Sequence, residues 1–123
     1  MDQNFPDREK LFRAVYPPSH PGMFWKRDGS LSSAAFADPK GLSVNRGGDR
    51  TDAESVEIMR QTFQGCIVSL RAGDCKEADA IVKYLPTKAN AYHSEIHQSE
   101  QVILLSKMQR LHLSKRAVIE YMA

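Results

Sequence analysis

Short apolar runs separated by turn residues dominate the first two thirds of this chain. Runs rich in β-branched and aromatic residues and bounded by Gly, Pro, Asn or Ser are typical of short strands. On this basis we predict strands at 11–16, 23–26, 41–44, 66–71, 91–97 and 102–105. The segment PPSHPG that follows the first of them cannot be regular structure, because prolines remove backbone donors and set turns.

One segment has a clear helical period. Residues 52–64 follow the sequence Thr51-x-x-Glu54, a capping box in which side chains satisfy the first free amides of a helix. Apolar residues then recur at the spacing of one helix face, and they are Val56, Met59 and Phe63. We therefore predict one main helix, at 52–64.

Three shorter segments carry helix-start signals. Asp74-x-x-Glu77 predicts a short helical turn, and Ser106-x-x-Gln109 predicts the start of a basic C-terminal helix. Ser32 or Ser33 can cap a brief turn over SSAAF. The run AVIEYM near the end either extends the C-terminal helix or forms a last strand, because a short apolar run does not define a period.

These elements predict an α+β fold with a mainly antiparallel or mixed sheet of short strands, packed by helix 52–64 and a C-terminal helix. A chain of 123 residues has the usual size of one domain. We place that domain at residues 10–123. Residues 1–9 are polar and contain Pro6, so we expect a loose N-terminal tail.

Composition narrows the cellular setting. The chain is 41% hydrophobic and 26% charged, as in ordinary folded proteins, and its net charge of +2 is too small to indicate nucleic acid by itself. No apolar run approaches the roughly 20 residues that cross a bilayer, and the N-terminus lacks the order of a signal peptide. We expect a cytoplasmic protein without a membrane partner. Two cysteines, Cys66 and Cys75, are too few for a disulfide framework.

Three polar side chains alternate along the strand predicted at 91–97. Residues two apart in a strand point to the same face, so His93, Glu95 and His97 should project together. Two imidazoles and a carboxylate are the ligands of a facial metal triad, and they also suit acid–base catalysis or direct ligand binding. A solvated polar strand face is the remaining interpretation. We take His93 and Glu95 as candidate catalytic residues and His97 as a candidate ligand contact.

Arg13 is the one charge inside the strand predicted at 11–16, on the face it shares with Leu11 and Val15. It is either a surface ion-pair partner or an anion clamp, because guanidinium binds phosphate or carboxylate through a two-pronged fork. The adjacent hydroxyls of Ser32 and Ser33 are caps or ligand contacts. We expect Arg13 to converge with His93 and Glu95 on one cleft.

The densest positive charge lies in the C-terminal helix. Lys107, Arg110, Lys115 and Arg116 form either a solvated face that complements the helix dipole or a nucleic-acid contact surface. The loop NRGGDR contains two glycines but lacks the GxxxxGK[ST] spacing, which excludes a P-loop.

The segments LFRAVYPP, SLSSAAFADPKGLSV and NAYHSEIHQ, in this order, resemble a family of small uncharacterised bacterial proteins with an SSAAF, LSV and H-x-E arrangement. The resemblance implies a bacterial or phage origin, in a mobile-element or defence locus. A second resemblance is to ADP-ribosyltransferase-like toxins, which place an Arg on an early strand, a Ser or Thr in the middle and a Glu on a late strand. Arg13, Ser32 or Ser33, and Glu95 follow that order, without an ExE or QxE pair.

These features together lead us to expect a small bacterial conflict-system or toxin-like protein that binds a nucleotide or other phosphate-bearing ligand in a polar cleft. Whether it is an enzyme, and whether it uses a cofactor, stays open. Catalysis would be transfer or hydrolysis with Glu95 or His93 as general base. The alternatives are a non-catalytic module that binds a partner protein or nucleic acid, and a metal-dependent hydrolase.

Overall fold

Six strands form a single antiparallel sheet in the order β4-β5-β2-β1-β3-β6. The computed structural model describes every residue from 1 to 123. The strands are β1 (Lys10–Val15), β2 (Leu42–Arg46), β3 (Cys66–Arg71), β4 (Ile81–Tyr84), β5 (His93–His97) and β6 (Val118–Tyr121). The helices are α1 (Asp52–Thr62), α2 (Ala72–Glu77), α3 (Lys107–Arg116) and the short 3-10 helix η1 (Ser33–Phe36).

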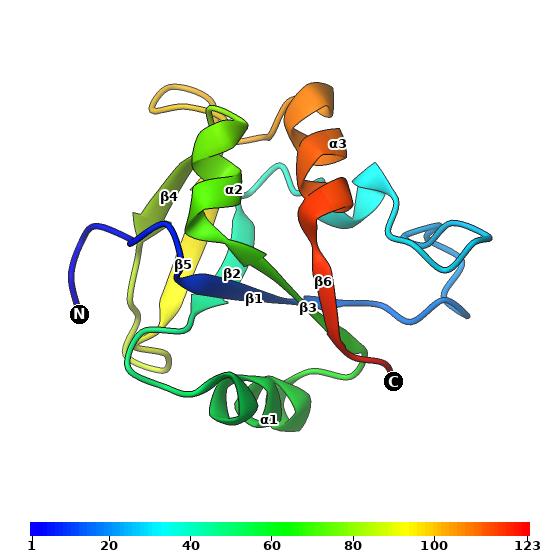
Figure 1. Cartoon of the computed structure of the whole chain (residues 1–123), viewed down its shortest axis with the longest axis horizontal. Coiled ribbons are helices and arrows are strands. Elements are labelled where there is room, and N and C mark those ends of the chain that lie inside the picture. The colour runs from blue at the N-terminus through cyan, green and yellow to red at the C-terminus, as the bar shows by residue number, and fades with distance from the viewer.

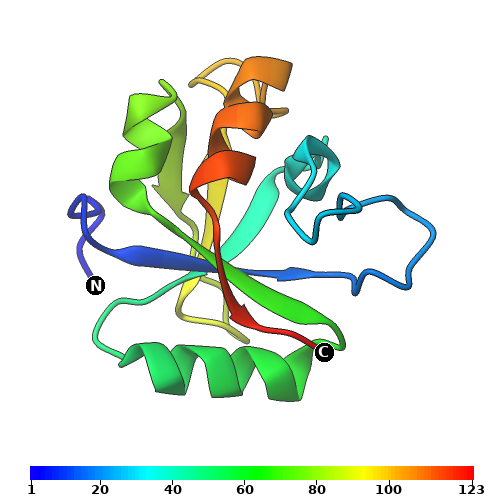
Figure 2. The same ribbon diagram turned by 45° about the vertical axis from the view of Figure 1, so that its right-hand side comes forward.

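The helices cover the sheet from both sides. Helix α1 lies below the sheet in Figure 1, whereas α2 and α3 lie above it, with η1 beside α3. Figure 2 shows the same two layers after rotation. The predicted α+β class with an antiparallel sheet is confirmed. None of the helices combines the length and the apolar character needed to cross a membrane.

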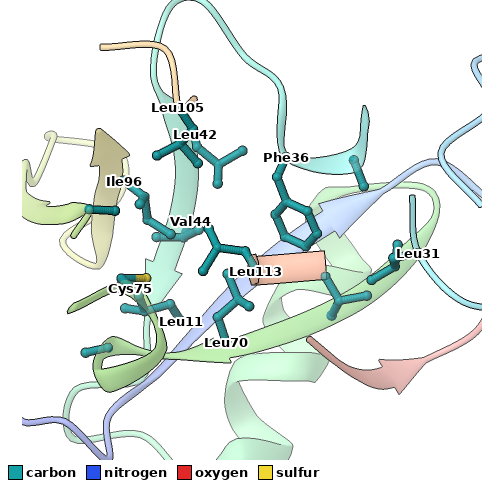
Figure 3. Close-up of a cluster of buried hydrophobic side chains, with 14 of the residues drawn as sticks. Leu11, Leu31, Phe36, Leu42, Val44, Leu70, Cys75, Ile96, Leu105 and Leu113 are labelled. Carbon is teal, nitrogen blue, oxygen red and sulfur yellow. The ribbon is translucent and has the colours of Figure 1, made fainter. Parts of the chain in front are cut away.

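The main core lies between the sheet and the layer of α2, α3 and η1. Leu113 of α3 lies among Val44, Leu70 and Phe36 in Figure 3, and all four side chains are buried. A smaller cluster under α1 consists of Phe12, Met59 and Ile67. Alternate side chains of β1 point to opposite faces of the sheet, which explains why there are two apolar clusters. Leu11 and Val15 face the main core, whereas Phe12 faces α1.

Capping chemistry sets the helix boundaries. Two of the three boxes predicted from sequence are present, at Thr51 and Glu54 for α1 and at Ser106 and Gln109 for α3. The third was wrong. Helix α2 begins at Ala72, three residues before the predicted start, because the Asp74 carboxylate accepts the backbone N–H of Arg71 at 2.8 Å.

Two predicted strands are absent. In place of a strand at 23–26, Trp25 forms a single bridge with Leu31, and Met23 has a positive φ of 58°. In place of a strand at 102–105, the chain turns back on itself, with the N–H of Gln98 donating to the carbonyl of Ile103. Neither segment pairs with a strand of the sheet. The run at 117–122, which the sequence left open, supplies β6.

Residues 1–9 contain no helix or strand, but they are not the loose tail that we expected. Phe5 is buried in the main core, and the guanidinium of Arg46 lies 4.0 Å from its ring centroid. Arg46 is itself only 2% exposed and forms two hydrogen bonds of 2.8 Å with the carboxylate of Glu9. A buried arginine needs such a partner, so this ion pair fixes the N-terminal segment to β2.

Candidate functional site

A cavity of about 580 Å³ lies between the C-terminal end of α1 and the sheet. Its polar wall includes Arg13, Ser43, Asn45, Asn90 and His93. Its apolar wall includes Val15, Tyr16, Met59 and Phe63. Small-molecule sites commonly have volumes of about 300–1,000 Å³ and combine apolar walls with a few polar groups, so the size and lining suit a ligand.

The cavity exists because two central strands separate. β1 pairs with β2 only at Leu11–Arg46 and Phe12–Asn45. Beyond these pairs β1 continues alongside β3, and β2 continues alongside β5. A gap therefore opens in the middle of the sheet, where backbone groups of β1 and β2 no longer satisfy one another.

Arg13 crosses this gap. Its Nε donates to the carbonyl of Ala35 in η1 at 2.9 Å, and its Nη1 donates to the carbonyl of Ser43 in β2 at 3.1 Å. The guanidinium thus ties β1 to β2 and to η1 where the ladder has ended. Both acceptors are neutral carbonyls.

No carboxylate neutralises Arg13. None of the ion pairs in the structure includes it. Burial lowers the pKa of Arg13, and only the charge of Asp38 opposes this. Because arginine stays protonated in proteins, the result is a largely buried cation without a bound counter-charge, in a residue that lines the cavity.

His93 lies opposite Asn45 in the β2–β5 ladder, and both side chains line the cavity. The amide of Asn90 donates to Oδ1 of Asn45 at 2.7 Å, which fixes the Asn45 side chain. Nε2 of His93 lies 3.2 Å from Oε2 of Glu95, and no hydrogen bond engages Nδ1. One imidazole nitrogen is therefore held by a carboxylate while the other remains free, the arrangement that suits a histidine base.

Glu95 bridges two histidines. Its other oxygen, Oε1, lies 2.8 Å from Nε2 of His97. Burial favours the neutral form of Glu95, but hydrogen bonds with His97 and His93 outweigh burial and hold the pKa of this carboxyl below its ordinary value. The predicted projection of the three side chains to one face is confirmed by these contacts.

The backbone of Gly41 packs against this carboxylate. A Cβ at position 41 would lie 2.2 Å from Oε1 of Glu95, and Gly41 has a φ of +114°. Only glycine fits such a position without strain. The resulting contact restricts the space around the Glu95 and His97 side chains.

The trio does not form a metal-binding arrangement. No group of three or more His, Cys, Asp or Glu side chains in the structure is placed to hold a metal ion, which contradicts the facial-triad interpretation. Both Nε2 atoms point to the carboxylate instead of to a shared point. The geometry is that of a hydrogen-bonded row from His93 through Glu95 to His97.

The predicted convergence of Arg13, His93 and Glu95 on one cleft is wrong. Arg13 and His93 line the cavity, whereas Glu95 and His97 do not. The pairing of Phe12 with Asn45, and of Asn45 with His93, places the side chains of Arg13 and Glu95 on opposite faces of the sheet. Arg13 belongs to the cavity lining at the point where β1 and β2 no longer pair.

The two serines proposed as ligand contacts lie elsewhere. Ser32 occupies the position before η1 but forms no side-chain cap, and its Oγ donates to the carbonyl of Met23 at 2.8 Å. Ser33 begins η1. Neither serine lines the cavity. Their place in the loop between β1 and β2 suggests a role in ordering that loop.

Two aromatic residues at the cavity were missed as site residues. Tyr16, the residue after β1, is 55% exposed, and Phe63, the C-cap of α1, is 45% exposed. The sequence placed Phe63 in the buried stripe of a helix ending at residue 64. The helix ends at Thr62, so Phe63 turns outward. The sequence holds only a weak signal for these two site residues. An aromatic residue at a helix end is common, and a strand that separates from its neighbour has no distinctive sequence pattern.

The basic residues of α3 have mixed surroundings. Lys107 and Lys115 are exposed, whereas Nε of Arg116 lies 3.7 Å from Oε2 of Glu77. Nε of Arg110 is buried. The four side chains therefore do not form one uniform surface of free positive charge.

Comparison with family models, with curated proteins and with solved structures finds no match to this chain.

Proposed function

We propose that this protein binds a small phosphate-bearing ligand, such as a nucleotide, in the cavity between α1 and the sheet. The observation that supports this most directly is that Arg13, a residue of the cavity lining, has no carboxylate partner for its guanidinium. A buried charge without a counter-charge is costly, and an anionic ligand supplies the missing partner.

The donors around Arg13 favour an anion. Guanidinium has five N–H donors, and protein carbonyls accept two of them here. The remaining donors are available to oxygen atoms of a ligand. His93, whose Nδ1 forms no hydrogen bond, lines the same cavity. Phosphate offers several acceptor oxygens to a fixed fork of this kind.

His93 is the residue that would do chemistry on such a ligand. Glu95 holds Nε2 of His93 and thereby orients the ring, which leaves Nδ1 to accept a proton from an attacking hydroxyl or water in transfer or hydrolysis. His97 orients Glu95 in turn. In this proposal His93 is the general base, and Glu95 and His97 are positioning residues.

The resemblance of the SSAAF, LSV and H-x-E segments supports a setting among small bacterial or phage conflict-system proteins. The order of Arg13 and Glu95 supports the likeness to toxin-like nucleotide-binding proteins less well, because these two residues lie on opposite faces of the sheet. The helix α3 is a weaker candidate for the binding surface, since Arg116 is near Glu77.

The test is isothermal titration calorimetry with AMP and with inorganic phosphate. We expect Arg13→Lys to weaken binding of both at least tenfold, because a single ammonium cannot replace the fork. Lys115→Ala is the matched control, since it removes an exposed charge far along α3. Thr62→Trp fills the cavity from α1 without removing Arg13 and should also abolish binding. Binding that survives both Arg13→Lys and Thr62→Trp refutes the proposal.

A further inference from the structure

Two exposed aromatic rings stand at the same cavity. Tyr16 and Phe63 both line it, and both have about half of their surface open to solvent. Exposed aromatic residues are unremarkable singly, but a pair of them at a ligand-sized cavity marks a place for a flat apolar group. Gln64, an amide that donates and accepts hydrogen bonds, lines the cavity beside Phe63.

The ring of Tyr16 is held in place although it is exposed. One face stacks on His20, with ring centroids 4.1 Å apart and an interplanar angle of 11°. The backbone carbonyl of Tyr16 accepts a hydrogen bond from Nε1 of Trp25 at 2.7 Å. The ring of Phe24 also stacks with that of Tyr16, with centroids 5.7 Å apart and an interplanar angle of 28°. The ring of Tyr16 is therefore ordered before any ligand binds.

Phe63 is held at the cavity by the end of α1. Its N–H donates to the carbonyl of Met59 at 2.8 Å, and its own backbone is extended, which ends the helix. Two residues later, Gly65 packs against β1, since a Cβ there would lie 2.6 Å from the carbonyl oxygen of Val15. This close approach brings the end of α1 against the end of β1, next to Tyr16.

We infer that the ligand is a mononucleotide whose base stacks on Tyr16 and Phe63 while its phosphate binds at Arg13. This inference rests on the proposed function and adds the class of ligand. Every nucleobase has an aromatic face, and stacking on protein aromatic rings stabilises base binding. The amides of Gln64 and Asn90 supply donors and acceptors for the edge of the base. A cavity of about 580 Å³ bounds the ligand to a single nucleotide.

The test compares two probes that share a phosphate and a ribose. AMP carries a base, whereas ribose 5-phosphate does not, so their difference in affinity measures the base alone. We expect AMP to bind about tenfold or more tightly than ribose 5-phosphate to the unmodified chain, the range that stacking by aromatic side chains gives. Calorimetry at one fixed salt concentration measures both affinities.

The variant for this test is Tyr16→Leu combined with Phe63→Leu, which keeps apolar bulk and removes both rings. We expect it to weaken AMP binding about tenfold and to leave ribose 5-phosphate binding unchanged. Met108→Leu is the matched control, because Met108 is an exposed apolar residue of α3 outside the cavity. Thermal unfolding of each variant confirms that the fold is retained.

The outcomes separate this inference from the proposed function. Equal affinities for AMP and ribose 5-phosphate, or AMP binding unchanged in the double leucine variant, overturn the base-stacking inference while Arg13-dependent phosphate binding stands. Absence of binding by both probes overturns the proposed function as well. A single-stranded oligonucleotide that binds more tightly than AMP and covers several nucleotides overturns the assignment to a mononucleotide.

Discussion

Arg13 and His93 line the same cavity although β2 separates their strands and their side chains leave the sheet from opposite faces. The gap between β1 and β2 is what brings them together. Arg13 therefore has two roles that can be tested separately, a structural one through Ala35 and Ser43 and a binding one through its free donors.

Arg13→Met should destabilise the fold. The substitution keeps the aliphatic packing of the side chain and removes the hydrogen bonds to the carbonyls of Ala35 and Ser43. Hydrogen bonds to charged groups contribute roughly 1.5–3 kcal/mol each, so the loss of both bonds should lower the free energy of unfolding by about 3–6 kcal/mol. Urea denaturation measures it. A loss below about 0.5 kcal/mol, the size of an ordinary surface substitution, would show that Arg13 does not tie the strands together.

Gly41→Ala should also destabilise the fold, because the new Cβ meets Oε1 of Glu95 and the backbone has a positive φ. Backbone strain of this kind costs about 1–3 kcal/mol. Part of the cost should disappear in a Glu95→Ala background, where the clashing carboxylate is gone. A double-mutant cycle by urea denaturation measures this coupling, and strictly additive effects would refute the contact.

The stability contributed by Glu95 should depend on acid pH. Its pKa is lowered in the folded protein. Burial alone would raise this pKa, but hydrogen bonds to His97 and His93 lower it by more. A lowered pKa stabilises the fold above the unfolded value of about 4.3, and this stabilisation is lost as pH falls through the lower folded value. Denaturation of the unmodified chain and of Glu95→Gln from pH 7 to pH 3 tests this. The two curves should converge at the acid end, and a constant separation would contradict the assignment.

Both cysteines should resist modification in the folded protein. Burial, followed by the charge of Asp74, raises the pKa of the Cys75 thiol to about 12, and Cys66 is fully buried as well. The thiolate is the reactive form, so a thiol reagent at pH 8 should react with neither residue until urea unfolds the chain. Rapid reaction of one thiol without denaturant would contradict this prediction, because it would show that the structure around that cysteine unfolds locally.

Local patterns were sufficient where local chemistry determines the structure. The capping boxes at Thr51 and Ser106 located α1 and α3, and the apolar run at 66–71 located β3. The strand predicted at 102–105 failed for a non-local reason. Residues 102–105 are as apolar as those of β6. Of these two segments, however, only β6 lies beside β3 and pairs with its edge.

The candidate site, like the fold, could be predicted only where it depends on local sequence. Alternation within β5 was enough to place His93, Glu95 and His97 on one face. Alternation cannot relate faces of different strands, because that depends on the register between them, and so the position of Arg13 relative to Glu95 was wrong. The cavity depends on the separation of β1 from β2. No residue type in either strand predicts that separation from the sequence.

The central claim is that an anionic ligand binds between Arg13 and His93, and NMR of the isotope-labelled chain tests it most directly. Titration with AMP should shift the backbone amide signals of Arg13, Ser43, Asn45 and His93 together, with a single affinity. Shifts confined to Lys107, Lys115 and their neighbours on α3, or no saturable shifts at all, would contradict the account.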